Sequence, residues 1–153
     1  MENIILVPGF SLLRACIALF LAWGSTLVVK EILEIKAYKK FKWSYFAREG
    51  GMPSSHSAWV FSMLMIIFLH TGFSLLTFFA GCMTAVILND TVHIRYQVGQ
   101  HKLILEKIAK KESNKYKLKR EGHTIPQVLI GSLLGIIITT LFLLLTKNII
   151  FFI

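Results

Sequence analysis

Acidic residues and evenly spread charge are what this sequence has least of. Of its 153 residues, 8 are Asp or Glu, 17 are Lys or Arg, and 55% are hydrophobic. No formally charged residue occurs between Ser57 and Asn89, and most of the charges gather in two blocks. A soluble domain carries charge over its whole surface, so this pattern excludes one and indicates an integral membrane protein.

Cysteines are also scarce, and each of the two lies inside an apolar run. For Cys16 and Cys82 we predict buried free thiols and no disulfide. The net charge of +9 is compatible with a nucleic-acid partner. Basic residues that border apolar segments are, however, typical of the cytoplasmic flanks of membrane helices. We therefore expect the lipid bilayer as partner, and no nucleic acid.

Four apolar segments predict an all-α membrane bundle that forms a single domain over residues 1–153. Each is near the roughly 20 residues that cross a bilayer. The expected spans are residues 10–30, 54–70, 73–92 and 124–146. The second and third should form a hairpin that turns near His70, because the uncharged run is too long for one span. Whether residues 3–13 span the membrane or lie at its interface is left open.

The basic residues predict the orientation of the bundle. Of the 17 Lys and Arg, 6 lie from Lys30 to Arg48 and 9 lie from Arg95 to Arg120. By the positive-inside rule, the loops 31–53 and 95–122 are then cytoplasmic, and both termini lie outside. In the second loop, LILEKIAKK predicts a short amphipathic helix. We expect the protein in the cell membrane, with its unusual polar residues meeting at the cytoplasmic face.

One of these polar stretches, GGMPSSHSA at residues 50–58, is typical of an anion-binding turn. Its glycines allow close approach to the backbone, and a helix N-terminus attracts phosphate or carboxylate through free N–H groups and the helix dipole. Ser54 or Ser55 should cap the following helix. His56 then falls in its first turn, beside any bound anion.

A second histidine, His123, precedes the last span in the same way. Thr124 should cap that span, and Pro126 suits its first turn. Two histidines at helix N-termini, with Lys30 and Arg95 nearby, can support phosphoryl transfer without a metal. One imidazole attacks phosphorus, the other protonates the leaving oxygen, and the cations and backbone N–H groups stabilise the oxygens.

Three motifs together resemble a known family. MPSSHSA, DTVHIRYQVGQH and GHTIPQVLIGSLLG, in this order, are similar to the divergent branch of the type-2 phosphatidic acid phosphatase superfamily. That superfamily includes acid phosphatases and vanadium haloperoxidases. The resemblance extends from about Lys30 to Gly135, and it implies a membrane enzyme with a phosphohistidine intermediate and no cofactor.

The resemblance also assigns residues to roles. It implies that His56 is the general acid, that His123 attacks phosphorus and that Gln127 occupies the position of the acid that orients His123. The expected phosphate-binding residues are Lys30, Gly51, Ser54, Ser55 and Arg95, with Asp90 and Arg120 as further candidates.

The chain departs from the family pattern at several positions. The orienting acid is Asp in the superfamily and Glu in this branch, whereas here it is Gln127. An amide oxygen can fix the histidine tautomer but cannot stabilise an imidazolium by charge, which by analogy with catalytic triads costs several orders of magnitude in rate. His93 and His101 replace the usual Gly and Gln, and the superfamily's first motif has no clean match.

We therefore predict a phosphatase that hydrolyses a phosphomonoester or diphosphate of a lipid at the cytoplasmic face. Phosphatidylglycerophosphate, phosphatidic acid and polyprenyl diphosphate are suitable substrates. One alternative is a catalytically inactive lipid-phosphate-binding protein. A second is a metal-dependent hydrolase that uses Asp90, His93, His56 and His123, although no tight metal-binding motif is present. A scaffold or transporter subunit is a third, and whether the chain forms a homo-oligomer is left open.

Overall fold

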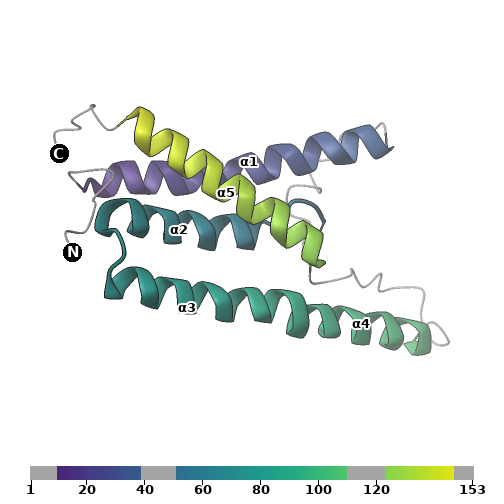
Figure 1. Ribbon diagram of the computed structural model, residues 1–153. Coiled ribbons are helices and arrows are strands. Elements are labelled where there is room, and N and C mark those ends of the chain that lie inside the picture. Colours follow the sequence, from purple (N-terminus) through teal and green to yellow (C-terminus); the bar gives the residue numbers. More distant parts are fainter. Residues whose placement is uncertain (1–9, 39–50, 110–122, 147–153) are drawn as a thin grey trace.

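The computed structural model describes residues 10–38, 51–109 and 123–146, and its regular elements are all helical (Figure 1). This confirms the predicted all-α class. In chain order the elements are α1 (Leu12–Tyr38), α2 (Ser55–Thr71), α3 (Leu75–Asn89), the π-helical turn η2 (Asp90–Ile94), α4 (Arg95–Ala109) and α5 (Ile125–Leu145).

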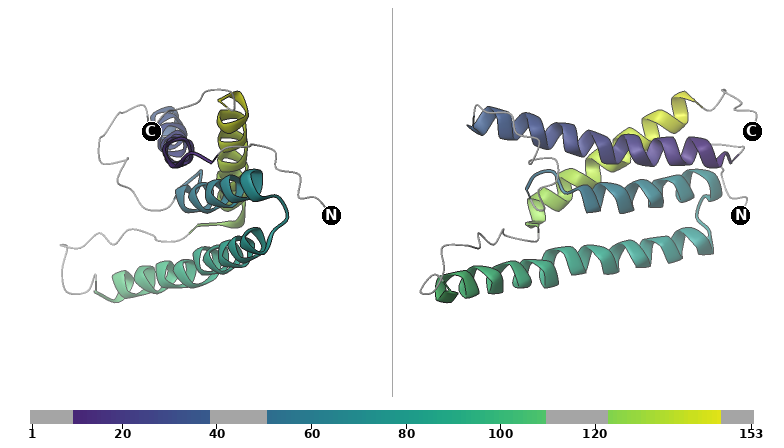
Figure 2. Two further views of the ribbon diagram at one scale, coloured as in Figure 1. Left: turned by 90° about the vertical axis from the view of Figure 1, so that its left-hand side faces the viewer. Right: turned by 180° about the vertical axis from the view of Figure 1, so that it is seen from behind.

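Helices α1, α2 and α5 pack together, and α3 lies along the outer side of α2 (Figures 1 and 2). Helix α5 crosses over α1 and α2. The start of α1 and the end of α5 lie at one end of the bundle, while the starts of α2 and α5 lie together at the other. The arrangement thus brings the two histidine-containing turns to the same end, as the sequence predicts.

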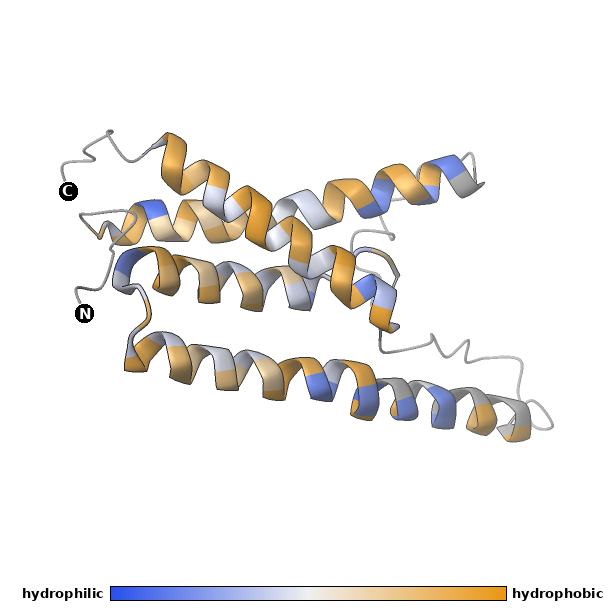
Figure 3. Ribbon diagram, in the orientation of Figure 1, coloured by the Kyte–Doolittle hydropathy of each residue, from blue (hydrophilic) through white to orange (hydrophobic). Residues whose placement is uncertain are grey.

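Three helical stretches are long and apolar enough to cross a membrane: Leu12–Lys36, Leu75–His101 and Ile125–Leu145. Helix α2, with 17 residues, is apolar but shorter. Figure 3 shows that apolar residues make up most of the length of α1, α2, α3 and α5. Exposed apolar side chains on α3, such as Phe78 at 70%, fit a helix that faces lipid.

Helix α1 extends further than the sequence analysis places the first span. The expected end was near Lys30, but the helix continues to Tyr38. The residues after Lys30 are mostly good helix formers, with neither Gly nor Pro to stop the helix. Lys30 therefore lies within α1. The basic segment after it, residues 39–50, falls outside the described residues, as do residues 3–9.

Arg14 lies inside α1 and is buried against the end of α5. Its side chain is 4% exposed, and its Nη2 donates to the Leu143 carbonyl oxygen at 3.1 Å and to Thr146 Oγ1 at 3.2 Å. A helix C-terminus presents carbonyl groups that lack intrahelical partners and carries partial negative charge. The guanidinium thus fastens α1 to α5 at the end of the bundle remote from the histidines.

The predicted hairpin between α2 and α3 is present. Gly72 has a φ of +60°, and its N–H donates to the Phe68 carbonyl oxygen at 2.8 Å. Ser74 is the N-cap of α3, and its side chain accepts from the Thr77 N–H at 3.2 Å. The turn therefore falls at the residues that the sequence marks.

The third helix differs more from its prediction. The sequence analysis places a loop from residue 95 onward, with a separate amphipathic helix inside it. Instead α3 passes through η2 directly into α4 and forms one rod as far as Ala109 (Figure 2). The polar residues end the apolar segment but not the helix, because the stretch from Asp90 to Ala109 contains no Pro and a single Gly, Gly99. Residues 110–122 lie outside the described part.

Both cysteines are free, but their predicted burial is wrong for one of them. Cys82 is exposed on α3, and Cys16 is partly buried. An apolar run in a membrane helix has a face toward lipid as well as a face toward protein, so apolar neighbours do not decide burial.

Small residues allow α2 and α5 to cross at close range. A Cβ at Gly131 would overlap the Ser54 carbonyl oxygen and Ser57 Oγ, and one at Gly135 would overlap the Ala58 carbonyl oxygen. Ser62 Oγ donates to the carbonyl oxygens of Ala58 at 2.7 Å and of Gly135 at 3.4 Å. Small residues spaced four apart are typical of close helix contacts in membranes.

We expect Gly131→Ala and Gly135→Ala to destabilise the bundle by about 1–3 kcal/mol, because the added methyl meets backbone on the facing helix. Thermal unfolding in detergent measures the effect. Gly24→Ala and Gly81→Ala are matched controls, since nothing lies within 4 Å of their Cβ positions. Equal effects at all four glycines would contradict the close crossing.

Candidate functional site

The turn before α2 is tied to α5. Gly51 has a φ of +87°, a backbone conformation that favours glycine. The Ser54 N–H donates to the Gln127 carbonyl oxygen at 3.0 Å, and Ser54 is fully buried. Ser54 is also the N-cap of α2, and its Oγ accepts from the Ser57 N–H at 3.4 Å. The cap is thus Ser54, while Ser55 opens the helix and His56 falls in its first turn, as the sequence predicts.

The turn before α5 is built around Gln127. Its Oε1 accepts from the Thr124 backbone N–H at 3.1 Å, in the manner of a capping box. The same oxygen lies 3.3 Å from His123 Nδ1. Thr124 occupies the N-cap position, and a proline lies in the first turn, as the sequence predicts. Gln127 therefore holds both the start of α5 and the histidine that precedes it.

These contacts define the proton position on His123. Its Nδ1 lies 3.2 Å from the Gly51 carbonyl oxygen as well as 3.3 Å from Gln127 Oε1. The Gly51 oxygen can only accept. The Gln127 oxygen is identified as Oε1 because it accepts from the Thr124 N–H. We therefore assign the proton to Nδ1, which leaves a lone pair on Nε2.

The two histidine rings are neighbours. The ring centroids of His56 and His123 lie 6.2 Å apart, with an angle of 57° between the ring planes. His123 is 4% exposed, whereas His56 is exposed at the end of the bundle. One imidazole is thus held firmly in the protein, and the other can meet a ligand from outside.

Lys30 reaches the same site from α1. The side chain is 5% exposed, and its Cε lies 3.8 Å from the position of a Cβ on Gly51. Burial lowers the pKa of His123 below its ordinary value of 6.5, and the nearby Lys30 and His56 lower it further. The hydrogen bonds to Gln127 and Gly51 act in the opposite direction without reversing the shift. The lowered pKa favours the neutral form of His123 at pH 7.

Two expected site residues lie on the rod instead. Arg95 Nε is 3.1 Å from Asp90 Oδ2, and both side chains are about half exposed, at 50% and 41%. Neither Arg95 nor Asp90 forms a hydrogen bond or ion pair with His123 in the described parts of the chain, residues 51–109 and 123–146. The sequence analysis leaves open whether Asp90 partners Arg95 or joins the site, and the structure shows the pairing. Arg120 lies outside the described residues.

The histidines of the rod do not form a metal site. His93 and His101 are exposed on η2 and α4. Within the described residues there is no group of three or more His, Cys, Asp and Glu side chains placed to hold a metal ion. The arrangement therefore does not favour the metal-dependent alternative that uses Asp90 and His93.

Sequence reasoning missed two features near the site. Glu31 is 6% exposed, and in the described structure neither of its carboxylate oxygens has a hydrogen-bond partner. No signal in the sequence indicates this burial. The capping role of Gln127 was also missed, although the spacing of Thr124 and Gln127 is that of a capping box and could have revealed it.

We predict that Lys30→Met and Gln127→Glu both raise the pKa of His123. The first removes a neighbouring cation, and the second places a carboxylate beside the imidazole. An NMR titration of ¹⁵N-labelled imidazoles, with the His123 signal identified by its loss in His123→Asn, measures the pKa and shows the tautomer. A pKa of His123 at or above 6.5 in the unmodified protein, or protonation at Nε2 of its neutral form, would contradict this description.

Comparisons with known proteins agree with the motifs. The model of the divergent PAP2 family matches residues 12–138. YuiD, an uncharacterized membrane protein of Bacillus subtilis (strain 168), is 28% identical over 152 residues, which cover 88% of this chain and 94% of that protein. No solved structure matches the chain. The family match covers both histidine-containing turns, all of α2 and most of α5, and this membrane protein therefore belongs to the divergent PAP2 family.

Proposed function

We propose that the protein is a lipid-phosphate phosphatase that works through a phosphohistidine on His123. The observation that carries this proposal is the environment of His123. Its Nδ1 lies beside two oxygen acceptors, burial keeps the ring neutral, and the imidazole of His56 lies 6.2 Å away. Such a pair can act on the two sides of one phosphorus atom.

In the first step, the lone pair of His123 Nε2 attacks phosphorus while the bond from phosphorus to the lipid oxygen breaks. His56, protonated at the start, gives its proton to that oxygen and releases the alcohol or lipid phosphate. In the second step, His56 takes a proton from water, the water oxygen bonds to phosphorus, and the N–P bond breaks. The net reaction consumes one water and returns both histidines to their starting states.

The phosphate oxygens would be stabilised by Lys30 and by the turn of Gly51, Ser54 and Ser55. Lys30 lies against that turn, and the N-terminus of α2 carries partial positive charge. Arg95 would contribute by exchanging Asp90 for a phosphate oxygen, since its ion pair is exposed and therefore weak. This assigns Asp90 the role of holding Arg95 when no substrate is bound.

A lipid substrate follows from the surroundings of the site. The histidines lie at the ends of apolar helices, where the phosphate of a membrane lipid would meet them. The clustering of Lys and Arg in the two loops supports a cytoplasmic position for this end in the cell membrane, by the positive-inside rule. Phosphatidic acid, phosphatidylglycerophosphate and polyprenyl diphosphate all combine a phosphate group with a hydrocarbon chain.

Gln127 favours a second candidate function, a lipid-phosphate-binding protein without turnover. The amide holds His123 in the required tautomer, but it adds no negative charge to balance the cation that forms when His123 attacks phosphorus. Binding needs only the turn, Lys30 and the histidines, and these are in place whether or not the chemistry follows.

Phosphate release from a panel of these lipids by detergent-purified protein tests the proposal. We expect His123→Ala to abolish release and His56→Ala to slow it by about 10²–10⁴-fold, the usual contribution of a general acid. Release should persist in EDTA, because the proposed steps use no metal. His101→Ala, a change at an exposed histidine of α4, is the control and should release phosphate at the unmodified rate.

Gln127→Glu separates the two candidate functions. We expect it to speed phosphate release, because a carboxylate stabilises the developing imidazolium. If neither the unmodified protein nor Gln127→Glu releases phosphate from any lipid, while vesicles containing phosphatidic acid still bind in a Lys30-dependent manner, the binding function is correct and the phosphatase proposal is not.

A further inference from the structure

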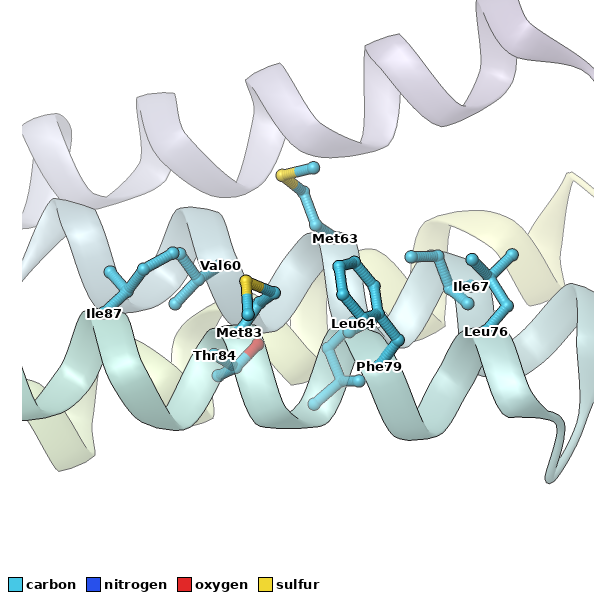
Figure 4. Close-up of a pocket in the computed structure, with 10 residues that line it drawn as sticks. Val60, Met63, Leu64, Ile67, Leu76, Phe79, Met83, Thr84 and Ile87 are labelled. Carbon is cyan, nitrogen blue, oxygen red and sulfur yellow. The ribbon is translucent and has the colours of Figure 1, made fainter.

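An apolar groove with a volume of about 230 Å³ runs between α2 and α3 (Figure 4). Val60, Met63 and Ile67 of α2 contribute to one wall, and Phe79 and Met83 of α3 contribute to the other. Among the ten lining residues, the hydroxyl of a buried threonine on α3 is the one polar side-chain group. Such walls cannot bind a headgroup, but they suit a hydrocarbon.

The groove and His56 lie on the same face of α2. Val60, Met63 and Ile67 follow His56 at positions i+4, i+7 and i+11, so all four lie on one face of α2. Side chains on a helix tilt toward its N-terminus, which directs His56 toward the end of the bundle while the others line the groove behind it. A ligand with its phosphate at His56 can therefore extend a chain directly into the groove.

The length of the groove fits a lipid of one leaflet. Its lining on α3 extends from Leu76 to Ile87, about 16 Å at roughly 1.5 Å per residue. The hydrocarbon core of a bilayer is about 30 Å thick, so each leaflet is about 15 Å. The thickness of a leaflet is set by the length of its acyl chains. One acyl chain is therefore about as long as the groove.

We propose that the groove binds one acyl chain of the phosphorylated lipid and so selects phosphatidic-acid-like substrates over polyprenyl phosphates. This inference rests on the proposed function for the phosphate end of the ligand. The walls suit saturated and unsaturated acyl chains of that length alike, since Met63 and Met83 have flexible, polarisable side chains that adapt to irregular shapes. The helix pair of the hairpin thus determines chain preference, while the histidines determine the chemistry.

Ala80 and Ala85 provide a matched test on one helix. Ala80 lines the groove, whereas Ala85 is exposed on α3 and is not among the lining residues. The Ala80→Trp side chain would fill the groove, and the Ala85→Trp side chain would extend into lipid. Both variants, together with the milder Ala80→Leu, are first compared with the unmodified protein by thermal unfolding and by elution from a size-exclusion column.

The binding measurement uses phosphatidic acid with a photoreactive diazirine in one acyl chain, in nanodiscs of phosphatidylcholine. We expect the label on peptides that contain residues 60–67 and 76–87. Ala80→Trp should reduce the labelling about tenfold, because it keeps part of the acyl chain out of the groove. Excluding only two methylene groups of that chain already weakens binding about tenfold. Ala80→Leu should reduce it less, and Ala85→Trp not at all.

A kinetic measurement compares long-chain phosphatidic acid with a short-chain, water-soluble form. Ala80→Trp should lower kcat/KM about tenfold for long-chain phosphatidic acid and leave it unchanged for the short-chain form. The size again corresponds to the loss of two buried methylene groups. Labelling that behaves as expected without any phosphate release would reject the phosphatase proposal but support the groove.

Two results would overturn the groove proposal. One is label spread evenly over all lipid-facing helices or unchanged by Ala80→Trp. The other is label displaced more strongly by excess polyprenyl phosphate than by phosphatidic acid.

Discussion

The close crossing of α2 and α5 is the contact on which the rest of the structure depends. Gly131 and Gly135 leave room for the backbone of residues 54–58, and the Ser54 N–H bonds to the carbonyl oxygen of Gln127. These contacts bring together two turns that are about seventy residues apart in sequence. His56 and His123 become neighbours because the helices they begin cannot separate without losing this packing.

Gln127 joins helix capping to the proposed chemistry. One oxygen serves the Thr124 N–H and His123 Nδ1, so the start of α5 and the histidine tautomer depend on the same amide. A glutamate would keep both contacts and add charge. In the proposed function, the amide fixes the histidine tautomer as a carboxylate would, but it adds no charge to balance an imidazolium.

The bundle has a firm part, formed by α1, α2 and α5, and an outer part, formed by α3 and its continuation. Helices α1, α2 and α5 are fastened at one end by Arg14 on the carbonyl groups of α5 and at the other by the paired turns. Helix α3 and its continuation contact mainly α2 and carry large exposed apolar surfaces. In the proposed function, the firm part holds the histidines and the outer helix contributes Arg95 and the hydrocarbon groove.

The sequence by itself determined the all-helical membrane class, the hairpin turn at residues 70–72, the cap at Thr124 and the meeting of two histidine turns at one end, and it left the cap of α2 open between Ser54 and Ser55. These follow from local composition and from motifs. Only the tertiary structure decided that α1 and α3 continue past their apolar segments, that Arg95 meets Asp90 and that Glu31 is buried. The physical reason is that polarity marks where a membrane ends, whereas helix length and side-chain burial depend on hydrogen bonding and on which neighbours pack against each face.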